Sequence, residues 1–237
     1  MLVENRQYLR WVVFPSPEQI RPSWRTVYLQ CGTVRWLPTH VRRSFQTYQV
    51  DLTPAPEALL EQYAAKTRQK IRKARRLGMW VERDEDPTEV IRLFRPIVRE
   101  KGLNPIDWET FRTKPNLLVS RVVSPDYGVL AAHAYSLDPA AGIVRGLYNA
   151  SAFRAFAQDN RGRRQAGVAN VFLYHADFLH FRQMGFHTYD FGGYGTPESG
   201  STFKDQFRGR LVEQYNYYPV AYYLLRRIRK VMRRWSR

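Results

Sequence analysis

Residues 164–190 read RQAGVANVFLYHADFLHFRQMGFHTYD. The apolar residues of the first part recur at three- and four-residue spacing, the period of an α-helix, at Val168, Val171, Phe172, Phe178 and Leu179. Gly185 follows where a helix would stop, and residues 186–190 then form a short run typical of a strand. This stretch therefore predicts a long helix from about Arg164 to Met184, followed directly by a strand.

Upstream of this helix, three β-branched or apolar runs predict strands at 117–123, 128–137 and 143–148. The turn sequences Ser124-Pro125-Asp126 and Asp138-Pro139 separate them, as in an antiparallel meander.

Two helices are predicted before the meander. The first is a long amphipathic helix that begins at Thr53-Pro54 and stops at Gly78. After a short strand, the second helix covers 86–101 and bends at Pro96.

Downstream of the long helix, a glycine-rich stretch at 192–195 precedes a short helix near 201–208 and a strand at 211–217. The last residues predict a basic helix with an apolar stripe of Val220, Leu224, Ile228, Val231 and Trp235. At the other end, short strand patterns include a hairpin at Cys31-Gly32. We therefore expect a β-rich N-terminal extension at 1–50, a main domain at 51–217 and a basic amphipathic helix at 218–237.

The composition fits one well-packed domain in a reducing compartment. Of the 237 residues, 44% are hydrophobic, which is enough to form a core in a chain of this length. Cys31 is the only cysteine, which excludes an internal disulfide and a thiolate metal cluster. Residues 1–10 mix acids with bases and lead into no long apolar run, so we expect neither a signal peptide nor a membrane span. The expected location is the cytoplasm, with peripheral contact to the inner membrane face left open.

The formal net charge is +17, and the basic residues are clustered. The blocks lie at 66–76, 161–164 and 226–237. Polyanions are the natural partners of such blocks, namely RNA, a nucleotide cofactor or an anionic membrane face, although a solvated helix face explains any single block equally well. In the first block we predict four residues along one helix face to bind tRNA or another polyanion, Lys66, Arg68, Arg72 and Arg75.

The segment Arg164-Gln165-Ala166-Gly167-Val168-Ala169 fits the pattern R-x-x-G-x-A. The small residues Gly167 and Ala169 would let backbone N–H groups and a helix N-terminus approach a donor phosphate, and Arg164 would add a charge-assisted contact. This pattern, and the order of elements around it, resembles the GNAT superfamily of acyltransferases. The resemblance implies an α/β (α+β) fold with a mixed, mostly antiparallel sheet flanked by helices.

Two further stretches are similar to the Fem branch of that superfamily, which transfers aminoacyl groups. One is the basic helix at 66–74, and the other joins Tyr189-Asp190-Phe191-Gly192-Gly193 to Phe203-Lys204-Asp205-Gln206-Phe207-Arg208-Gly209, similar to Y-D-F-G-G and F-K-x-x-F-G-G elements. The resemblance covers residues 46–217. The chain departs from the family at Arg208, which replaces a glycine, in having room for one GNAT unit where full-length Fem enzymes have two, and in lacking the helical hairpin of some members.

The resemblance implies an N-acyltransferase, in which an amine attacks an acyl carbonyl without an enzyme nucleophile. Lys204 matches the family lysine that stabilises the developing oxyanion, an effect worth roughly 3 kcal/mol for a preorganised donor. Asp190 would either orient the amine and accept its proton or cap the glycine turn. Candidates for the acyl pocket are Arg145, Tyr148 and Tyr194.

The five histidines, His40, His133, His175, His180 and His187, form no H-x-x-x-H or H-E-x-x-H metal pattern. His133 is either a general base or, more simply, a satisfied core histidine. No G-x-S-x-G or Walker-type loop is present. We therefore expect neither a metal nor a tightly bound cofactor.

Three hypotheses for the function follow. The leading one is transfer of an aminoacyl group from aminoacyl-tRNA to an amine of a cell-envelope precursor or small peptide. The second has acyl-CoA as donor and an amino sugar or other small amine as acceptor. The R-x-x-G-x-A pattern favours acyl-CoA, whereas the lysine motif and the basic helix favour tRNA. The third, a non-catalytic RNA-binding or membrane-surface protein, explains the charge but leaves the motif around Lys204 unexplained.

Overall fold

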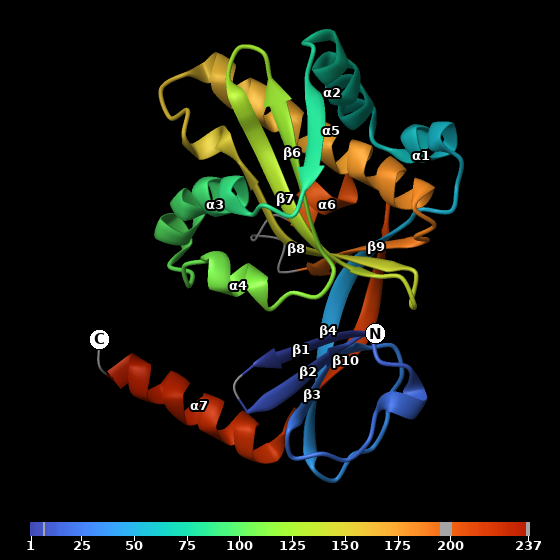
Figure 1. The fold of residues 1–237 in the computed structure, drawn as a ribbon, viewed down its shortest axis with the longest axis vertical. Coiled ribbons are helices and arrows are strands. Elements are labelled where there is room, and N and C mark those ends of the chain that lie inside the picture. The colour runs from blue at the N-terminus through green and yellow to red at the C-terminus, as the bar shows by residue number, and fades with distance from the viewer. Residues whose placement is uncertain (7, 195–200, 236–237) are drawn as a thin grey trace. The chain divides into compact units, whose positions relative to one another are not determined.

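The structure, a computed structural model, describes residues 1–6, 8–194 and 201–235 (Figure 1). The chain divides into one unit of residues 1–47 with 212–237 and a second of residues 48–211. Two strands, β4 (His40–Asp51) and β10 (Arg210–Pro219), contribute residues to both units. This differs from the three consecutive parts expected from the sequence, because the two ends of the chain belong to one unit. Gly195 of the glycine-rich stretch and the last two residues of the expected 218–237 helix lie outside the described residues.

The sheet of the second unit has the strand order β4-β9-β8-β7-β6-β5. Its further strands are β5 (Trp80–Asp84), β6 (Leu117–Ser124), β7 (Gly128–Asp138), β8 (Ile143–Ser151) and β9 (Thr188–Gly193). Neighbours from β5 to β8 pair antiparallel, as the meander predicted, and β8 pairs with β9 in parallel. The predicted fold class, a mixed and mostly antiparallel sheet flanked by helices, is confirmed.

Six helices flank this sheet among the described residues: α1 (Pro56–Gln62), α2 (Ala65–Arg76), α3 (Thr88–Lys101), α4 (Trp108–Arg112), α5 (Asn160–Gln183) and α6 (Ser201–Asp205). The register shows that α5 and α3 cover opposite faces. His133 of β7 bonds to Asn170 of α5, whereas the opposite face carries Tyr148, whose ring contacts Phe94 of α3 (Figure 1).

The long helix predicted to begin at Thr53-Pro54 is in fact two helices, α1 and α2. The break lies at Tyr63, whose backbone is extended, and at Ala64, whose N–H donates to the carbonyl of Gln206 at 3.0 Å. Arg68 donates to the Tyr63 carbonyl at 2.6 Å and so satisfies the exposed end of α1. The predicted helix stops at Gly78 and Gly102 are confirmed, since each follows its helix with positive φ.

The core of the second unit is rich in aromatic rings. Tyr174 and Phe178 on α5 pack against Tyr189 of β9 and against Phe207, which follows α6. Phe207 and Tyr189 are fully buried. These contacts fix the segment around α6 to the end of β9, and this is where the candidate site lies.

The first unit contains β1 (Leu2–Arg6), β2 (Leu9–Val13), β3 (Thr26–Cys31), β10 and β4 in the order β1-β2-β3-β10-β4, and also helix α7 (Val220–Trp235). The hairpin predicted at Cys31-Gly32 is wrong. β3 pairs with β2 in parallel and with β10 antiparallel, and the N–H of Gln30 donates to Asn216 Oδ1 at 2.8 Å. The local turn pattern predicted the wrong partner, because β3 pairs with a strand near the other end of the chain.

Candidate active site

Lys204 projects from α6 onto the glycine turn that ends β9. Its Nζ donates to the carbonyl oxygen of Gly193 at 2.6 Å and lies 3.5 Å from that of Phe191. Burial lowers the pKa of Lys204, and the charge of Asp190 partly opposes this shift. The two Fem-like motifs are thus brought together in space.

Asp190 caps the glycine turn. Its Oδ1 accepts from the N–H of Gly192 at 2.6 Å, its Oδ2 accepts from Gln49 at 2.9 Å, and the side chain is fully buried. Gly192 has φ of 72°, a conformation that favours glycine. Of the two roles expected for Asp190, the structure therefore shows the cap, and through its charge Asp190 also favours the ammonium form of Lys204.

Strands β8 and β9 part close to this turn. Their parallel pairing covers Ile143–Arg145 with Thr188–Asp190, and no further pair is found between them within the described residues. Gly146 lies where pairing stops, and a Cβ there would come within 2.8 Å of the Tyr189 hydroxyl.

A β-bulge in β8 brings two predicted pocket residues to one face. Tyr148 pairs with Ala134 but Gly146 pairs with Tyr135, so Leu147 is the extra residue. Arg145 and Tyr148, three residues apart, therefore lie opposite Ser136 and Ala134, which share a face. A regular strand would have placed them on opposite faces.

The three predicted acyl-pocket residues have different surroundings. Arg145 is the register partner of Asp190. Tyr194 donates to Asp205 at 2.8 Å and stacks on Tyr48, with 5.5 Å between ring centroids. Tyr148 instead packs edge-on against Phe94 and Phe111. The structure thus places Arg145 and Tyr194 next to the Asp190 and Lys204 elements, and Tyr148 under α3 and α4.

A hollow of about 380 Å³ lies between the end of α2 and the start of α5. It is lined by Lys73, Leu77, Asn160, Arg161, Arg164 and Gln165. Two basic blocks that are far apart in sequence therefore meet in one cationic cavity, although Arg161 is also paired with Asp126 at 3.2 Å. Such a cavity is suited to phosphate groups.

The predicted start of α5 near Arg164 is wrong by four residues. Asp159 is the N-cap and accepts from the N–H of Arg161 at 2.9 Å, and bonding to the N–H of Gly162 lowers the pKa of Asp159. Gly167 and Ala169 consequently lie inside α5, where backbone N–H groups are used by the helix itself. Phosphate contact in this cavity would come mainly from the side chains of Lys73 and Arg164.

We expected Lys66, Arg68, Arg72 and Arg75 to lie along one face of the helix, but the basic residues of α2 form two separate rows. Lys66, Lys70 and Lys73 are spaced i, i+4 and i+7 and form one row, while Arg68, Arg72 and Arg75 form another. The buried residues of the helix, Thr67, Ile71 and Ala74, lie between the two rows. Only the first row leads to the cationic cavity, and Arg68 is occupied by the carbonyls that end α1.

His133 belongs to a buried polar network that sequence patterns did not reveal. Its ring nitrogens bond to the Tyr135 hydroxyl and to Asn170, each at 2.9 Å, and burial lowers its pKa to about 4. The Tyr135 hydroxyl donates to Asp177 at 2.5 Å, and Arg83 pairs with Asp177. His133 is therefore a neutral core histidine, the simpler of its two interpretations. In the described part of the chain, no group of three or more His, Cys, Asp or Glu could hold a metal ion.

The Arg208 departure from the Fem pattern has a structural explanation. Arg208 has φ of 55°, the left-handed conformation in which glycine is strain-free. At Gly209 a Cβ would lie 2.3 Å from the carbonyl oxygen of Gln49. The two glycines of the family pattern thus correspond to one position with positive φ, which Arg208 tolerates, and one with no room for a side chain.

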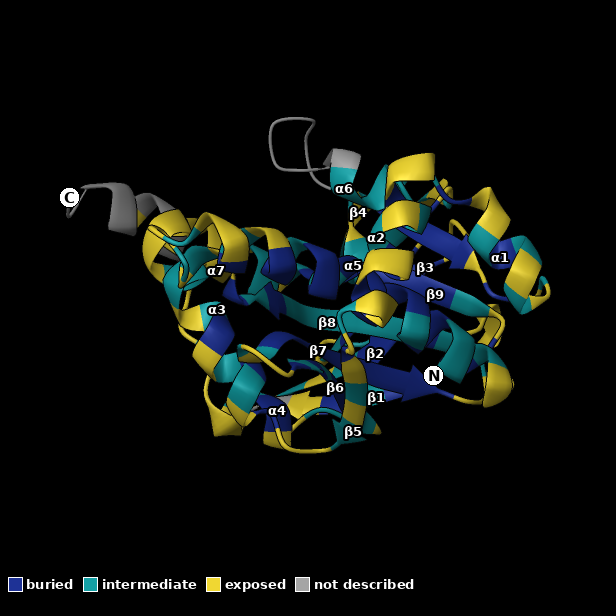
Figure 2. Ribbon diagram, turned by 90° about the horizontal axis from the view of Figure 1, so that it is seen from above, coloured by how far each residue is buried: buried dark blue, intermediate teal, exposed yellow. Residues whose placement is uncertain are grey.

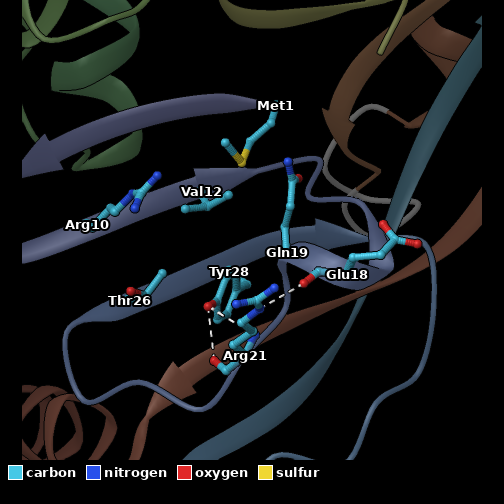
Figure 3. Close-up of a pocket in the computed structure, with 8 residues that line it drawn as sticks. All are labelled: Met1, Arg10, Val12, Glu18, Gln19, Arg21, Thr26 and Tyr28. Atoms are coloured by element: carbon cyan, nitrogen blue, oxygen red, sulfur yellow. Dashed lines mark hydrogen bonds between the residues drawn. The ribbon is translucent and has the colours of Figure 1, made fainter. Parts of the chain in front are cut away.

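Another hollow, of about 310 Å³, lies in the first unit (Figure 3). Figure 3 shows Tyr28 beside Arg21, with a hydroxyl that donates to the carbonyl of Arg21 at 3.0 Å. None of the residues that line it is a predicted site residue.

Solved structures share this architecture. FemX has a TM-score of 0.59 and 16% sequence identity, over 77% of this chain and 63% of FemX. The fold is similar to that of FemX. The FemX fold is also found in the C-terminal domain of a protein from Agrobacterium fabrum designated a lysylphosphatidylglycerol synthetase, with a TM-score of 0.55 and 13% identity over 91% of this chain and 79% of that domain. The sequence matches no protein-family model and no curated protein sequence. The present chain spans less than two thirds of FemX.

Proposed function

We propose that the protein is an N-acyltransferase whose active site is the Lys204 ammonium and the glycine turn at the end of β9. The observation that carries this proposal is the contact between Lys204 and the Gly193 carbonyl, at the point where β8 and β9 part. The likeness in fold to FemX and to the lysylphosphatidylglycerol synthetase domain supports acyl transfer.

The chemistry suits such a site. The lone pair of the acceptor amine attacks the acyl carbonyl carbon, a C–N bond forms, and the carbonyl oxygen becomes negative. The bond to the leaving oxygen or sulfur then breaks, and the proton lost by the amine ends on the leaving group or in water. An ammonium has three N–H donors, and the Phe191 and Gly193 carbonyls use at most two, so one remains for the oxyanion.

For the donor we propose aminoacyl-tRNA. The row of Lys66, Lys70 and Lys73 continues into the cationic cavity beside Arg164, which gives a track for a phosphate backbone. The likeness to a domain of a protein named for making lysylphosphatidylglycerol is consistent with transfer of an aminoacyl group. The proposed acceptor is an amine of a cell-envelope precursor or small peptide.

A second donor, acyl-CoA, is favoured by one specific observation. Lys73 and Arg164 both line the cavity of about 380 Å³. Two such cations in one cavity are enough to bind a pyrophosphate, which does not need the longer row of lysines on α2. In this case the acceptor would be an amino sugar or another small amine.

The decisive experiment measures donor and chemistry separately. Coenzyme A, uncharged tRNA and aminoacyl-tRNA are tested for binding to the wild-type protein and to a Lys73→Glu, Arg164→Glu variant, and acyl transfer to a panel of amines is followed with labelled donor. Tight tRNA binding that the variant loses supports the leading donor, and a melting-point rise with coenzyme A alone supports the second. Lys204→Met, which leaves the cavity intact, should bind either donor but transfer slowly. Binding of neither donor, with no transfer, contradicts the proposed function.

A further inference from the structure

Helix α7 is attached to its unit by a tyrosine-bearing face. The ring of Tyr222 meets that of Trp11 on β2 edge-on, with centroids 6.0 Å apart. The guanidinium of Arg43 on β4 lies over the ring of Tyr223, at 5.0 Å from its centroid, and donates to its hydroxyl. The first turn is also tied by the N–H of Val220, which donates to the carbonyl of Thr39.

The large apolar residues of α7 face solvent. Leu224, Leu225, Ile228 and Met232 are between 53% and 58% exposed, and the described part of the helix is mostly exposed or half-buried (Figure 2). Their spacing of i, i+1, i+4 and i+8 places them on one side of the helix. Leu224 follows Tyr222 by two residues and so points roughly away from the tyrosine contact. An amphipathic helix of a soluble domain normally buries its apolar side, and α7 does the opposite.

The charge of α7 narrows the choice of partner. Arg226 and Arg227 are exposed, and the Arg226 guanidinium also lies over the Tyr218 ring of β10, 6.0 Å from its centroid. The sequence of residues 220–235 also contains Arg229, Lys230, Arg233 and Arg234 but neither aspartate nor glutamate. A second copy of the chain would bring a helix of the same charge against it. RNA would neutralise the positive charge of α7 but leave its four large apolar side chains exposed to water. An anionic bilayer surface satisfies both, because its headgroups attract arginine and its acyl region takes the apolar side chains.

We propose that α7 is a docking helix for a membrane surface that contains anionic phospholipids. It lies in the plane of that surface, with Leu224, Leu225, Ile228 and Met232 in the acyl region and Arg227 reaching the headgroups, while Arg226 stays over the Tyr218 ring. None of the helices among the described residues has the length and apolar content needed to cross a bilayer, and α7 itself is 16 residues long. This proposal is independent of the proposed acyl transfer, since docking is measured without turnover.

The test is co-sedimentation of the full chain with vesicles of phosphatidylcholine, with and without about 30% phosphatidylglycerol. The wild-type protein should bind the anionic vesicles at least tenfold more tightly than the neutral ones. The Leu225→Asp, Ile228→Asp variant should lose this binding. A matched control, Val34→Asp with Leu103→Asp, removes two other exposed apolar residues and changes the net charge equally, and it should bind as the wild type does. Because all four positions are exposed, each variant should keep its melting temperature.

Three results would overturn the proposal. One is that the wild-type protein does not co-sediment with anionic vesicles. Another is an α7 variant that binds vesicles as tightly as the matched control, which would leave only diffuse charge attraction. The third is a different partner: if Leu225→Asp, Ile228→Asp converts a dimer to a monomer in sedimentation velocity, a second copy covers the helix. If tRNA binding is lost with Arg226→Glu, Arg227→Glu while vesicles never bind, α7 is an RNA surface.

Discussion

The ammonium nitrogen of Lys204 lies 2.6 Å from the carbonyl oxygen of Gly193. This contact joins a short helix to the glycine turn of a strand that has just left its neighbour in the sheet. It holds the charged group in place before any substrate arrives, which is the preorganisation that oxyanion stabilisation requires.

Lys204→Met should lower kcat of acyl transfer by roughly a hundredfold with little change in KM, because the ammonium acts on charge that develops only in the transition state. Lys204→Arg should recover little, since a planar guanidinium directs its N–H groups differently. Steady-state kinetics of the three proteins, with melting curves as the control for folding, provide the measurement. A Met variant with wild-type turnover would show that Lys204 is only a polar contact of the turn.

The activity should also fall at high pH earlier than an ordinary lysine would allow. Burial lowers the pKa of Lys204 from its usual 10.5, so the ammonium is lost as pH rises through that lowered value. A profile of log kcat against pH should therefore bend downward below pH 10.5 in the wild type and lose that bend in Lys204→Met. If the bend persists in Lys204→Met, the titrating group is not Lys204.

The cationic cavity predicts which charges matter for a polyanionic donor. Lys73→Glu with Arg164→Glu should weaken tRNA binding and flatten the plot of log affinity against log salt by about one unit per lost phosphate contact. Arg95→Glu with Arg99→Glu on α3 changes the net charge equally on the other face of the sheet, and should flatten the slope far less. Arg72→Glu with Arg75→Glu tests the second row of α2. Equal effects of all three pairs would mean that no track exists.

Arg208→Gly should stabilise the fold by about 1 kcal/mol, because a non-glycine residue with positive φ carries strain that glycine does not. Gly209→Ala should destabilise it, since the new Cβ meets the Gln49 carbonyl. Urea unfolding of both variants, with Gly32→Ala as a glycine change in open space, separates the two effects. If Arg208→Gly is destabilising, the arginine side chain contributes more than its backbone costs.

The buried His133 predicts a specific acid sensitivity. Burial lowers its pKa from the usual 6.5 to about 4 in the folded protein, so the unfolded chain binds the extra proton first and stability is lost as pH falls from 6.5 towards 4. Protonation of His133 in the unfolded chain should lower the free energy of unfolding by about 2 kcal/mol between neutral pH and pH 5. Asp177, with its pKa raised to about 6, acts in the opposite direction but is present in both proteins compared. The free energy of unfolding of His133→Gln should accordingly depend less on pH than that of the wild type, and equal slopes would contradict the assignment.

The elements that the sequence predicted well are those specified by local chemistry. The meander and the helix stops at Gly78 and Gly102 follow from turn residues and periodicity.

The elements that it missed depend on distant partners. The break at Tyr63 is made by the carbonyl of Gln206, and the ion pair of Arg83 with Asp177 joins a strand to a helix. The bulge at Leu147, which aligns Arg145 with Tyr148, is a property of strand register. No window of sequence contains both partners of these contacts, so no local pattern could reveal them.

The first unit is built from both ends of the chain, and this has a consequence for biosynthesis. Residues 48–211 form their own unit, but the first forty-seven residues must wait for the end of the chain, because β3 pairs with β10 and Gln30 bonds to Asn216. During that interval β3 presents an unpaired edge, which is an opportunity for aggregation. A released chain that ends before residue 212 should therefore resist protease in its middle segment and be cut near its beginning.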